Sequence, residues 1–529
     1  MPAELSWSGW GDPAQSSDLP AAVLELLRTG LGVTRATPAP AAIEELTLHA
    51  PRLPAAVARR LSATVGAAHA GDDHATRARH ALGRSTLDLL ALRAGAPLPA
   101  PDLVLTPGSH AEVMAILEIC SDGRVAVVPF GGGTSVVGGV SPDAAGFAGW
   151  VVLDLARLDA LHELDTESRL ARLGPGLRGP DAEAQLGARG YTIGHFPQSF
   201  EYASLGGFAA ARSSGQASAG YGRFDDLVVA LRVAAPAGEL ALGRAPKSAA
   251  GPDLRQLVLG SEGAFGVITE LTVQVRPVPE LRIYDGWRLP DFAAGCAALR
   301  RLAQDGPVPT VLRLSDEAET AVGLAGPNAI GSGTATGCLA IAGYEGAGEE
   351  VRARRAGAAA VLQDAGGRID PEAGAAWARE RYRGPYLRDA LLDAGALVET
   401  LETVTFWRAV PELYAAVTAA LRDTLTAAGT PPIILCHVSH VYRAGASLYF
   451  TVACAQAQDP AAQWRAAKRM TGAAILAHGG SISHHHGIGR DHRDELAREL
   501  GDLGVELLRS VKRTLDPSGI LNPGILIAQ

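Results

Sequence analysis

"PFGGGTSVVGG", residues 129 to 139, follows the apolar run "VAVV", which predicts a buried strand. Glycine tolerates positive φ and has no side chain, so a glycine-rich turn after a strand can bring bare N–H groups to phosphate oxygens. The stretch matches neither G-x-G-x-x-G nor the phosphate loop that requires a lysine, which weakens the nicotinamide and nucleoside triphosphate interpretations. It predicts a phosphate cradle of another kind, although a glycine run alone is also typical of a plain tight turn.

Two more Gly/Ser-rich turns follow in the same part of the chain. They are "GHFPQSFEYASLGGFAAARSSG" (194–215) and "LVLGSEGAFGVITE" (257–270), each beside an expected strand or helix start. Three such turns can surround one dinucleotide. Their combination favours the cradle over the plain turn.

Hydrophobic pattern and composition divide the chain into four segments. Residues 1–97 mix short helical patterns with proline-rich breaks and predict an N-terminal helical lead-in. Residues 98–280 alternate strands and helices with the glycine-rich turns. Residues 281–480 predict a second α/β domain of amphipathic helices and strands, and residues 481–529 are mainly helical.

Composition restricts the class of partner. Hydrophobic residues make up 47% of the chain and charged residues 19%, the balance of a soluble globular protein. The formal net charge of -9 argues against a nucleic-acid partner, whose binding needs clustered Lys and Arg, and favours a small molecule. Five cysteines without a C-x-x-C pair fit a reducing compartment. The start lacks a signal-peptide pattern, no stretch resembles a membrane span and "ILIAQ" is not a peroxisomal tripeptide, so we expect a cytoplasmic location.

The order of the short motifs carries a family resemblance. P-x-G-G-G-T-S is followed by G-H-x-P-x-S, R-x-S-G, G-S-E-G-x-x-G-V-I-T-E and R-P-V-P-E. This order resembles the FAD-binding domain of the vanillyl-alcohol-oxidase type. Within that group the chain is similar, almost from end to end, to the alkyldihydroxyacetonephosphate synthase family of FAD enzymes, through "WSGWGDP", "YLRDALLDAG", "LETVTFW", "CHVSHVYRAGASLYF", "GGSISHHHGIG" and "SVKRTLDPSGILNPG".

The resemblance implies an α+β fold: a two-subdomain FAD-binding domain at 98–280, an α/β substrate or cap domain at 281–480, and helical termini, with 481–529 completing the active site. It implies FAD bound without a covalent link, because the first loop lacks the histidine that often carries a tethered flavin. The second loop departs from the family, which favours Asp and Thr where Gln198 and Ser204 stand. The residues expected to contact FAD are Pro129, Phe130, Gly131, Gly132, Gly133, Thr134, Ser135, Gln198, Ser199, Phe200, Glu201, Tyr202, Ala203, Ser204, Ala211, Arg212, Ser213, Ser214, Glu262, Gly263, Ala264, Phe265, Gly266, Val267 and Ile268.

Side chains outside these loops have the chemistry that a phosphorylated ketone would need, namely cations for the anionic group and a group that moves a proton. The resemblance implies that Arg388 binds or orients the substrate, that Tyr449 transfers the proton and that Arg313 supports the site. Each also has an ordinary structural interpretation. Arg388 could be a surface ion-pair residue, Tyr449 a core aromatic, and Arg313 a partner of Asp316 or Glu317.

The triplet His484, His485 and His486 in "SISHHHGIGRDH" directs three imidazoles differently, so burial alone does not account for all of them. The resemblance implies that they line the cavity at the flavin and share in catalysis. A metal site is the rival interpretation, since histidine is a common ligand.

FAD-dependent 2-hydroxy-acid dehydrogenases or oxidases of the D-lactate or glycolate type share this fold and define the alternative function. They carry E-H-G-I-G where this chain has H-H-G-I-G at 485–489, and a metal motif H-x-G-D-G-N-x-H of which this chain keeps only His440. We therefore expect no catalytic metal. A non-enzymatic flavoprotein is a third interpretation, which Arg388, Tyr449 and the triplet together disfavour.

The resulting hypothesis is an FAD-dependent transferase that exchanges the fatty acyl group of acyl-dihydroxyacetone phosphate for a fatty alcohol. Such a reaction belongs to ether-lipid synthesis and has no net redox change. The expected partner is a lipid-like small molecule, without nucleic acid. Peripheral membrane contact and a homodimer are left open, because no amphipathic anchor is evident in the sequence.

Overall fold

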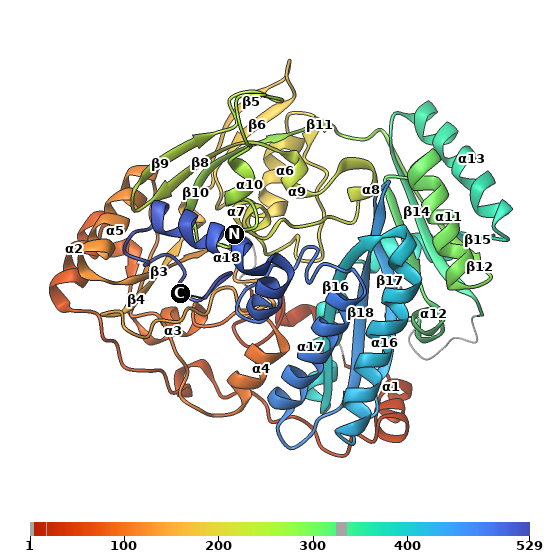
Figure 1. Cartoon of the computed structure of the whole chain (residues 1–529), viewed down its shortest axis with the longest axis horizontal. Helices are drawn as coiled ribbons and strands as arrows, with labels where there is room; N and C mark the ends of the chain where they lie inside the picture. The colour runs from red at the N-terminus through yellow and green to blue at the C-terminus, as the bar shows by residue number, and fades with distance from the viewer. Residues whose placement is uncertain (1–4, 17, 324–335, 529) are drawn as a thin grey trace.

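A computed structural model describes residues 5–16, 18–323 and 336–528 (Figure 1). Its first sheet has the strand order β1-β2-β4-β3, with β1 (Ala70–Gly71), β2 (Leu103–Leu105), β4 (Trp150–Asp154) and β3 (Ala126–Phe130). Strands β2, β4 and β3 are parallel. Helices α2 (Ala55–Val65) and α5 (His110–Gly123) cover this sheet. Helix α5 buries positions i, i+3, i+4 and i+7, which are Val113, Ile116, Leu117 and Cys120.

The second sheet is antiparallel and has the order β5-β6-β10-β8-β9, with β5 (Leu161–Asp165), β6 (Leu170–Leu173), β10 (Val267–Gln274), β8 (Val228–Ala235) and β9 (Gly238–Leu242). A small ribbon pairs β7 (Tyr191–Thr192) with β11 (Arg276–Pro277). Its helices are α6 (Gly179–Gly187), α7 (Leu205–Ala211), α8 (Ser218–Tyr221), α9 (Phe224–Leu227) and α10 (Arg255–Val258). The first glycine-rich turn leaves β3, the second leads into α7, and the third leads into β10.

The third sheet is antiparallel and has the order β15-β12-β14-β13-β17-β18-β16. Its strands are β15 (Arg368–Asp370), β12 (Leu281–Leu289), β14 (Cys338–Gly346), β13 (Val311–Ser315), β17 (Ile433–Val441), β18 (Gly445–Ala455) and β16 (Ala396–Phe406). Four long helices pack on one face: α11 (Phe292–Asp305), α13 (Gly348–Asp364), α16 (Val410–Ala427) and α17 (Pro460–Ala477). Shorter helices are α12 (Glu317–Val322), α14 (Pro371–Glu380) and α15 (Gly384–Asp393).

The two faces of this third sheet differ in polarity. On β18, Leu448 and Phe450 are fully buried in the core under the helices. Successive side chains alternate between faces, so Tyr449 and Thr451 point the other way. The middle of that second face carries polar side chains that line a cavity beside the glycine-rich turns, and this positions the functional site.

Both terminal regions return to the body of the molecule. Near the start, α1 (Ala21–Glu25) precedes a turn that packs on the third sheet, and α3 (His74–Arg79) and α4 (Thr86–Arg93) follow. Helix α18 (Arg493–Leu515) crosses back over the first two sheets (Figure 1), and Leu521 pairs with Val127 of β3. The expected α+β class, with a two-part first domain, a cap domain and helical termini, is confirmed.

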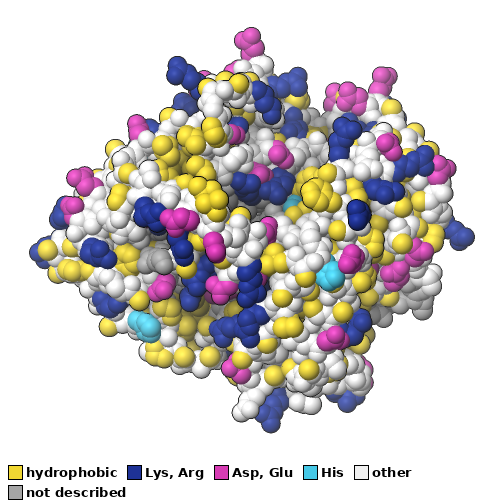
Figure 2. Space-filling model, in the orientation of Figure 1, with side chains coloured by type: hydrophobic (Ala, Val, Ile, Leu, Met, Phe, Trp, Pro, Cys, Tyr) yellow, Lys and Arg dark blue, Asp and Glu magenta, His cyan; other side chains and the backbone are white. Residues whose placement is uncertain are grey.

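Within the described ranges, no helix has the length and apolar character needed to cross a membrane. On the face shown in Figure 2, basic and acidic side chains are interspersed. That face therefore presents no continuous basic area of the kind that nucleic acid requires.

Candidate functional site

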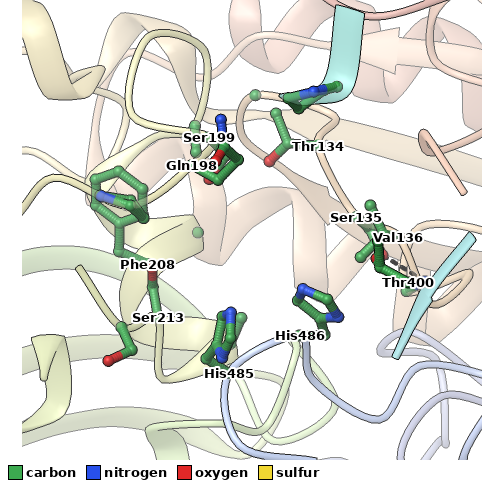
Figure 3. Close-up of a pocket in the computed structure, with 18 of the residues that line it drawn as sticks. Thr134, Ser135, Val136, Gln198, Ser199, Phe208, Ser213, Thr400, His485 and His486 are labelled. Carbon is green, nitrogen blue, oxygen red and sulfur yellow. Dashed lines mark hydrogen bonds between the residues drawn. The ribbon is translucent and has the colours of Figure 1, made fainter. Parts of the chain in front are cut away.

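A cavity of about 410 Å³ lies where the glycine-rich loops meet the polar face of the third sheet. This volume is within the range of small-molecule sites, about 300–1,000 Å³. Figure 3 shows Thr134 of the first loop, Ser213, Thr400 of β16, His485 and His486 around this space. The cavity thus brings together segments that are far apart in the sequence.

The first loop offers unpaired amides to the cavity. In the part of the chain that the structure describes, the N–H groups of residues 132–136 donate no hydrogen bond, although these residues line the cavity. Gly133 has a φ of +67°, which a side chain would disfavour. A row of free amides at a strand end is the donor set that a pyrophosphate needs, so the expected FAD fits this loop.

Most of the residues expected to contact FAD line the cavity. They are Pro129, Phe130, Gly131, Gly132, Gly133, Thr134, Ser135, Gln198, Ser199, Ala203, Ser204, Ala211, Ser213, Ser214, Glu262, Gly263, Gly266 and Ile268. Backbone contacts hold the loops together: a Cβ on Gly132 would lie 2.0 Å from the carbonyl oxygen of Tyr202.

The remaining expected contacts point away from the cavity, because loops and strands present alternate residues to it. The ring of Phe200 stacks on that of Tyr382 and makes an edge-to-face contact with Phe196. Arg212 donates to the carbonyls of Leu259 and Gln256. The others that do not line the cavity are Glu201, Tyr202, Ala264, Phe265 and Val267, of which the last four are buried in cores.

Three strands place a row of polar side chains along the cavity wall. Glu402 of β16 lies directly opposite Tyr449 of β18, and Tyr449 lies opposite His437 of β17. Cross-strand neighbours point to the same face. The rings of His437 and Tyr449 stack with centroids 4.8 Å apart and an interplanar angle of 20°. The expected site residue Tyr449 therefore stands in the middle of a polar row and not in the apolar core.

Tyr449 is a neutral phenol at physiological pH. Burial raises its pKa to about 12, and a hydrogen bond with Thr400 opposes that shift only in part. His485 stacks on the same ring at 6.2 Å, and His486 meets its edge at 5.5 Å. The phenol can donate a hydrogen bond, and it has imidazoles on both sides.

Two carboxylates, the buried Glu402 and the partly buried Glu262, hold the two halves of the segment 484–489. Glu402 accepts hydrogen bonds from three consecutive amides, those of His484 (2.6 Å), His485 (3.1 Å) and His486 (2.9 Å). Glu262, from the loop before β10, accepts the amides of Ile488 and Gly489, both at 2.9 Å. The segment 484–489 is thereby fixed between the cap sheet and the second sheet.

The electrostatics of the two carboxylates differ. Burial raises the pKa of Glu262 to about 7, and its two amide bonds offset only part of that effect. Burial also disfavours ionised Glu402, but the charges that His485 and His486 gain when they are protonated at low pH, together with the amide bonds, outweigh it and lower the pKa to about 2. Glu402 is therefore a fixed negative charge beneath the triplet.

The imidazoles of the triplet are neutral. Burial lowers the pKa of His486 to about 3, and it lowers the pKa of His485 even though Glu402 acts in the opposite direction. His485 and His486 line the cavity, whereas His484 lies behind them, where Nε2 contacts the Tyr442 hydroxyl at 2.6 Å. Two of the three histidines thus offer neutral imidazoles to a ligand, and His484 supports them.

Arg388 of α15 lines the cavity and is 9% exposed, so it is not a surface ion-pair residue. Its Nε and Nη2 donate to one oxygen of Asp389, at 2.9 and 2.6 Å, and its Nη1 donates to the carbonyl of Arg84 at 2.6 Å. The amide of Trp10 donates to the other oxygen of Asp389. The position of Arg388 is therefore fixed, and its charge is largely offset.

Arg313 of β13 lines the cavity and pairs with Glu319, not with Asp316 or Glu317. Glu319 is fully buried and also contacts Nδ1 of His437 at 2.8 Å. Burial raises the cost of its charge, but the charge that His437 gains when it is protonated at low pH, together with Arg313, outweighs that effect and lowers the pKa of Glu319 to about 2. Burial and the neighbouring Arg313 lower the pKa of His437, so its imidazole is neutral.

Several cavity residues were not singled out from the sequence. A strand bulge at Ser439 lets His437, Ser439 and His440 all line the cavity, although strict alternation would send His440 to the other face. The "H-V-S-H" spacing was the available signal. Trp10, from a region without a recognisable chemical motif, also lines the cavity.

His440, His484 and His485 place one ring nitrogen each within 4.8 Å of one another. These are the described residues that could hold a metal ion. Their nitrogens already have protein partners: Nδ1 of His440 contacts Ser218 at 2.7 Å, and Nδ1 of His484 contacts Nδ1 of His485 at 2.9 Å. The histidines are thus oriented by one another and by hydroxyl groups.

Comparison with known families identifies both halves of the chain. The family described as "FAD binding domain" matches residues 101–242, and the family described as "FAD linked oxidases, C-terminal domain" matches residues 278–526. These matches confirm FAD as the cofactor expected from the glycine-rich loops.

Individual relatives agree with this result. The chain is 33% identical to alkyldihydroxyacetonephosphate synthase of Dictyostelium discoideum, with 86% of this chain and 78% of that protein covered. It is 31% identical to the synthase of Trypanosoma brucei brucei, with 99% of this chain and 92% of that protein covered. A solved structure of alkyldihydroxyacetonephosphate synthase superposes with a TM-score of 0.83 at 30% identity, covering 98% of each chain.

Proposed function

Since the chain belongs to the alkyldihydroxyacetonephosphate synthase family of FAD-dependent enzymes, we propose that it exchanges the acyl group of acyl-dihydroxyacetone phosphate for a fatty alcohol. The ester C–O bond at the carbon beside the ketone breaks, and the fatty acid leaves as its carboxylate. The alcohol oxygen then forms an ether bond to that carbon and loses its proton. The sum of these steps contains no oxidation or reduction.

One observation supports this chemistry above the others, namely a protonated Tyr449 between neutral imidazoles of His437 and His485. A neutral imidazole accepts a proton at physiological pH, and a phenol with a raised pKa donates one or holds a hydrogen bond. We assign His485 or His486 as the acceptor of the proton next to the ketone. Tyr449 donates a hydrogen bond to the oxygen where charge develops. After the ether bond has formed, the imidazole returns its proton to the carbon, and both groups are restored.

The cofactor would be held by the amides of residues 132–136 and by the other loops that line the cavity. When bound, FAD would supply an electron-accepting ring to the reaction. The first loop has no histidine or cysteine, which supports a dissociable cofactor. Arg388, fixed by Asp389, orients the substrate.

The cavity also suits an aliphatic substrate. One part of its wall is apolar, from Trp10, Leu387, Leu391 and Val398. These side chains can hold a fatty chain by burial of its methylene groups. They also exclude water, which would otherwise compete with the alcohol for the reacting carbon.

The alternative, a 2-hydroxy-acid dehydrogenase, has less support. The chain lacks the Asp-Gly-Asn of the metal motif, and residue 485 is histidine where those enzymes have glutamate. His440, the remaining motif histidine, contacts the hydroxyls of Ser214 and Ser218.

The test is a product assay. Holoenzyme is incubated with acyl-dihydroxyacetone phosphate and a deuterated long-chain alcohol, and the lipid and free fatty acid are measured by mass spectrometry. We expect one fatty acid released for each deuterated ether formed. Fatty acid release without label in an ether would refute the exchange, and flavin reduction by D-lactate or glycolate would favour the alternative.

A further inference from the structure

Arg381 is a cation in the cavity wall. It belongs neither to the sequence motifs nor to the polar row of Glu402, Tyr449 and His437, here called the catalytic row. It follows α14 directly and lines the cavity. Its carbonyl accepts a hydrogen bond from Nε2 of Gln216 at 3.2 Å, and Gln216 also lines the cavity. The backbone at Arg381 is therefore fixed from the side of the FAD-binding domain.

The charge of Arg381 is not offset in the way that the other two cavity arginines are. Arg313 pairs with Glu319, and Arg388 pairs with Asp389. Among the described residues, Arg381 forms no ion pair, and its Nη1 is buried without a hydrogen-bond partner.

Aromatic rings surround the Arg381 guanidinium. Its central carbon lies 5.0 Å from the ring centroid of Tyr382, 5.4 Å from Phe196 and 5.7 Å from Trp377. Rings hold a cation by their quadrupoles without supplying a negative charge. Burial raises the pKa of Tyr382 to about 12 despite the nearby guanidinium, so this phenol is neutral as well.

Three of the nearby carboxylates already have partners, and the charge of a fourth, Glu201, is opposed by Arg383. Glu345 accepts the hydroxyls of Tyr221 and Tyr284, at 3.1 and 2.6 Å. Glu183 accepts the Thr192 hydroxyl at 2.5 Å, and Glu380, which also lines the cavity, has a partner of its own. Arg381 is thus a partly buried cation that forms no ion pair among the described residues, and its buried Nη1 is free to bind an anion.

The position of Arg381 relative to the catalytic row indicates which anion it would bind. Trp377, beside Arg381, packs with Val311 in one apolar cluster. Val311 lies two residues before Arg313 on β13, on the same face, which corresponds to roughly 6–7 Å along the strand. Arg313 contacts His437, which stacks on Tyr449. An anion bound at Arg381 would therefore be separated from Tyr449, where the reacting carbon is expected, by the side chains of Arg313 and His437.

We propose that Arg381 binds the phosphate monoester of the substrate in the aromatic pocket of Phe196, Trp377 and Tyr382. This assignment rests on the proposed function, whose substrate is a phosphorylated ketone, and adds the residue that holds its phosphate. In such a ketone the phosphate is on the far side of the carbonyl from the exchanging carbon. A 2-hydroxy acid carries its carboxylate on the reacting carbon and would need its cation beside Tyr449. Guanidinium pairs bidentately with phosphate, which favours arginine for this role.

The test uses Arg381→Gln, with Arg379→Gln as the matched control, since Arg379 is an exposed arginine of α14 close in the sequence. Binding of radiolabelled inorganic phosphate to the holoenzyme is measured by equilibrium dialysis. We expect Arg381→Gln to weaken phosphate binding at least tenfold, and Arg379→Gln to leave it unchanged. Equal affinity in wild type and Arg381→Gln, or no phosphate binding in wild type, would overturn the assignment.

Kinetics and cofactor content give the second measurement. For Arg381→Gln we expect a KM for acyl-dihydroxyacetone phosphate raised at least tenfold, a kcat within about threefold, and an unchanged ratio of FAD to protein. Loss of FAD would instead assign Arg381 to the cofactor. Arg381→Lys keeps the charge and should recover part of the affinity. This variant keeps the test decisive if Arg381→Gln fails to fold.

The same data separate this inference from the proposed function. If wild type forms no ether but its phosphate binding depends on Arg381, the reaction assigned above is wrong and the anion site remains. If wild type forms ether and Arg381→Gln has an unchanged KM, the reaction remains and the assignment of Arg381 is wrong.

Discussion

Tyr449 combines a raised pKa with two imidazole neighbours, and its hydroxyl is the group that the mechanism depends on most. We expect Tyr449→Phe to lower kcat by at least 100-fold, because general acid–base groups typically contribute 10²–10⁴-fold. The change removes one oxygen outside the glycine-rich loops, so FAD content should be unchanged. Steady-state kinetics and flavin absorbance on the same preparation measure both quantities.

Tyr414→Phe is the control for that substitution. Tyr414 also bonds a carboxylate, Asp316 at 3.0 Å, but it lies under the helices on the opposite face of the sheet and does not line the cavity. We expect near-normal kcat in this variant. Activity that falls in proportion to flavin content in Tyr449→Phe would make the hydroxyl structural.

At the residue scale, the sequence revealed groups with unusual local patterns and missed groups whose partners are distant. The histidine triplet and the "YLRDALL" arginine are visible as short motifs. Glu402 is an ordinary alternating residue of "LETVTFW", and only the ladder between β16 and β18 shows that it faces Tyr449. The pairing of Arg313 with Glu319 rather than Glu317 likewise depends on the turn into α12.

At the scale of elements, the first glycine-rich loop depends on close backbone contact. A Cβ on Gly132 would lie 2.0 Å from the carbonyl oxygen of Tyr202, and backbone cannot move aside cheaply. We expect Gly132→Ala to displace the loop and to weaken FAD binding at least tenfold, measured by fluorescence titration of apoprotein. Gly187→Ala is the control, since the space around Gly187 in α6 is open within 4 Å. Equal FAD affinity in both variants would contradict this account of the loop.

The segment 484–489 gives a prediction about pH. The folded-state pKa of Glu402 is about 2, below its usual 4.5, so its contribution to stability is fully present above pH 4.5 and is lost as the pH falls toward 2. Glu402→Gln cannot ionise and loses that contribution at neutral pH, at a cost of about 2–3 kcal/mol for bonds to a charged group.

Urea unfolding of wild type and Glu402→Gln between pH 7 and pH 3 measures this contribution. We expect the difference in midpoint to be largest near pH 7 and to shrink below pH 4.5. A difference that is constant over the whole range would show that the carboxylate charge has no part in holding the triplet.

The order of strands and helices was predicted better than the bulges and side-chain orientations within them. The strand, turn and helix order around the glycine-rich loops followed from period and composition, because each signal is local. The bulge at Ser439, which turns His440 into the cavity, departs from strict alternation, and its one local signal is the three-residue spacing of the histidines in "CHVSHVY". The FAD contacts expected at Ala264, Phe265 and Val267 point into the core because the family motif marks a segment and not the orientation of each side chain.

At the scale of the whole molecule, the site exists only when distant parts of the chain meet. Trp10 bonds Asp389, Leu521 pairs with β3, and the triplet segment bridges Glu262 and Glu402. The sequence predicted the α+β class and the FAD-binding half, since these depend on local patterns and motif order. The contribution of the N-terminal region to the cavity depends on long-range packing that no local pattern encodes.

The central claim is that this cavity exchanges an acyl group for an alkyl group without net redox change, and anaerobic turnover tests it most directly. Holoenzyme without any electron acceptor is given acyl-dihydroxyacetone phosphate and labelled alcohol, while the flavin spectrum and the labelled ether are followed together. The account predicts many ethers per flavin, with the flavin oxidised at the end. Product that stops at one equivalent per flavin, with a lasting loss of flavin absorbance that an acceptor restores, would contradict it.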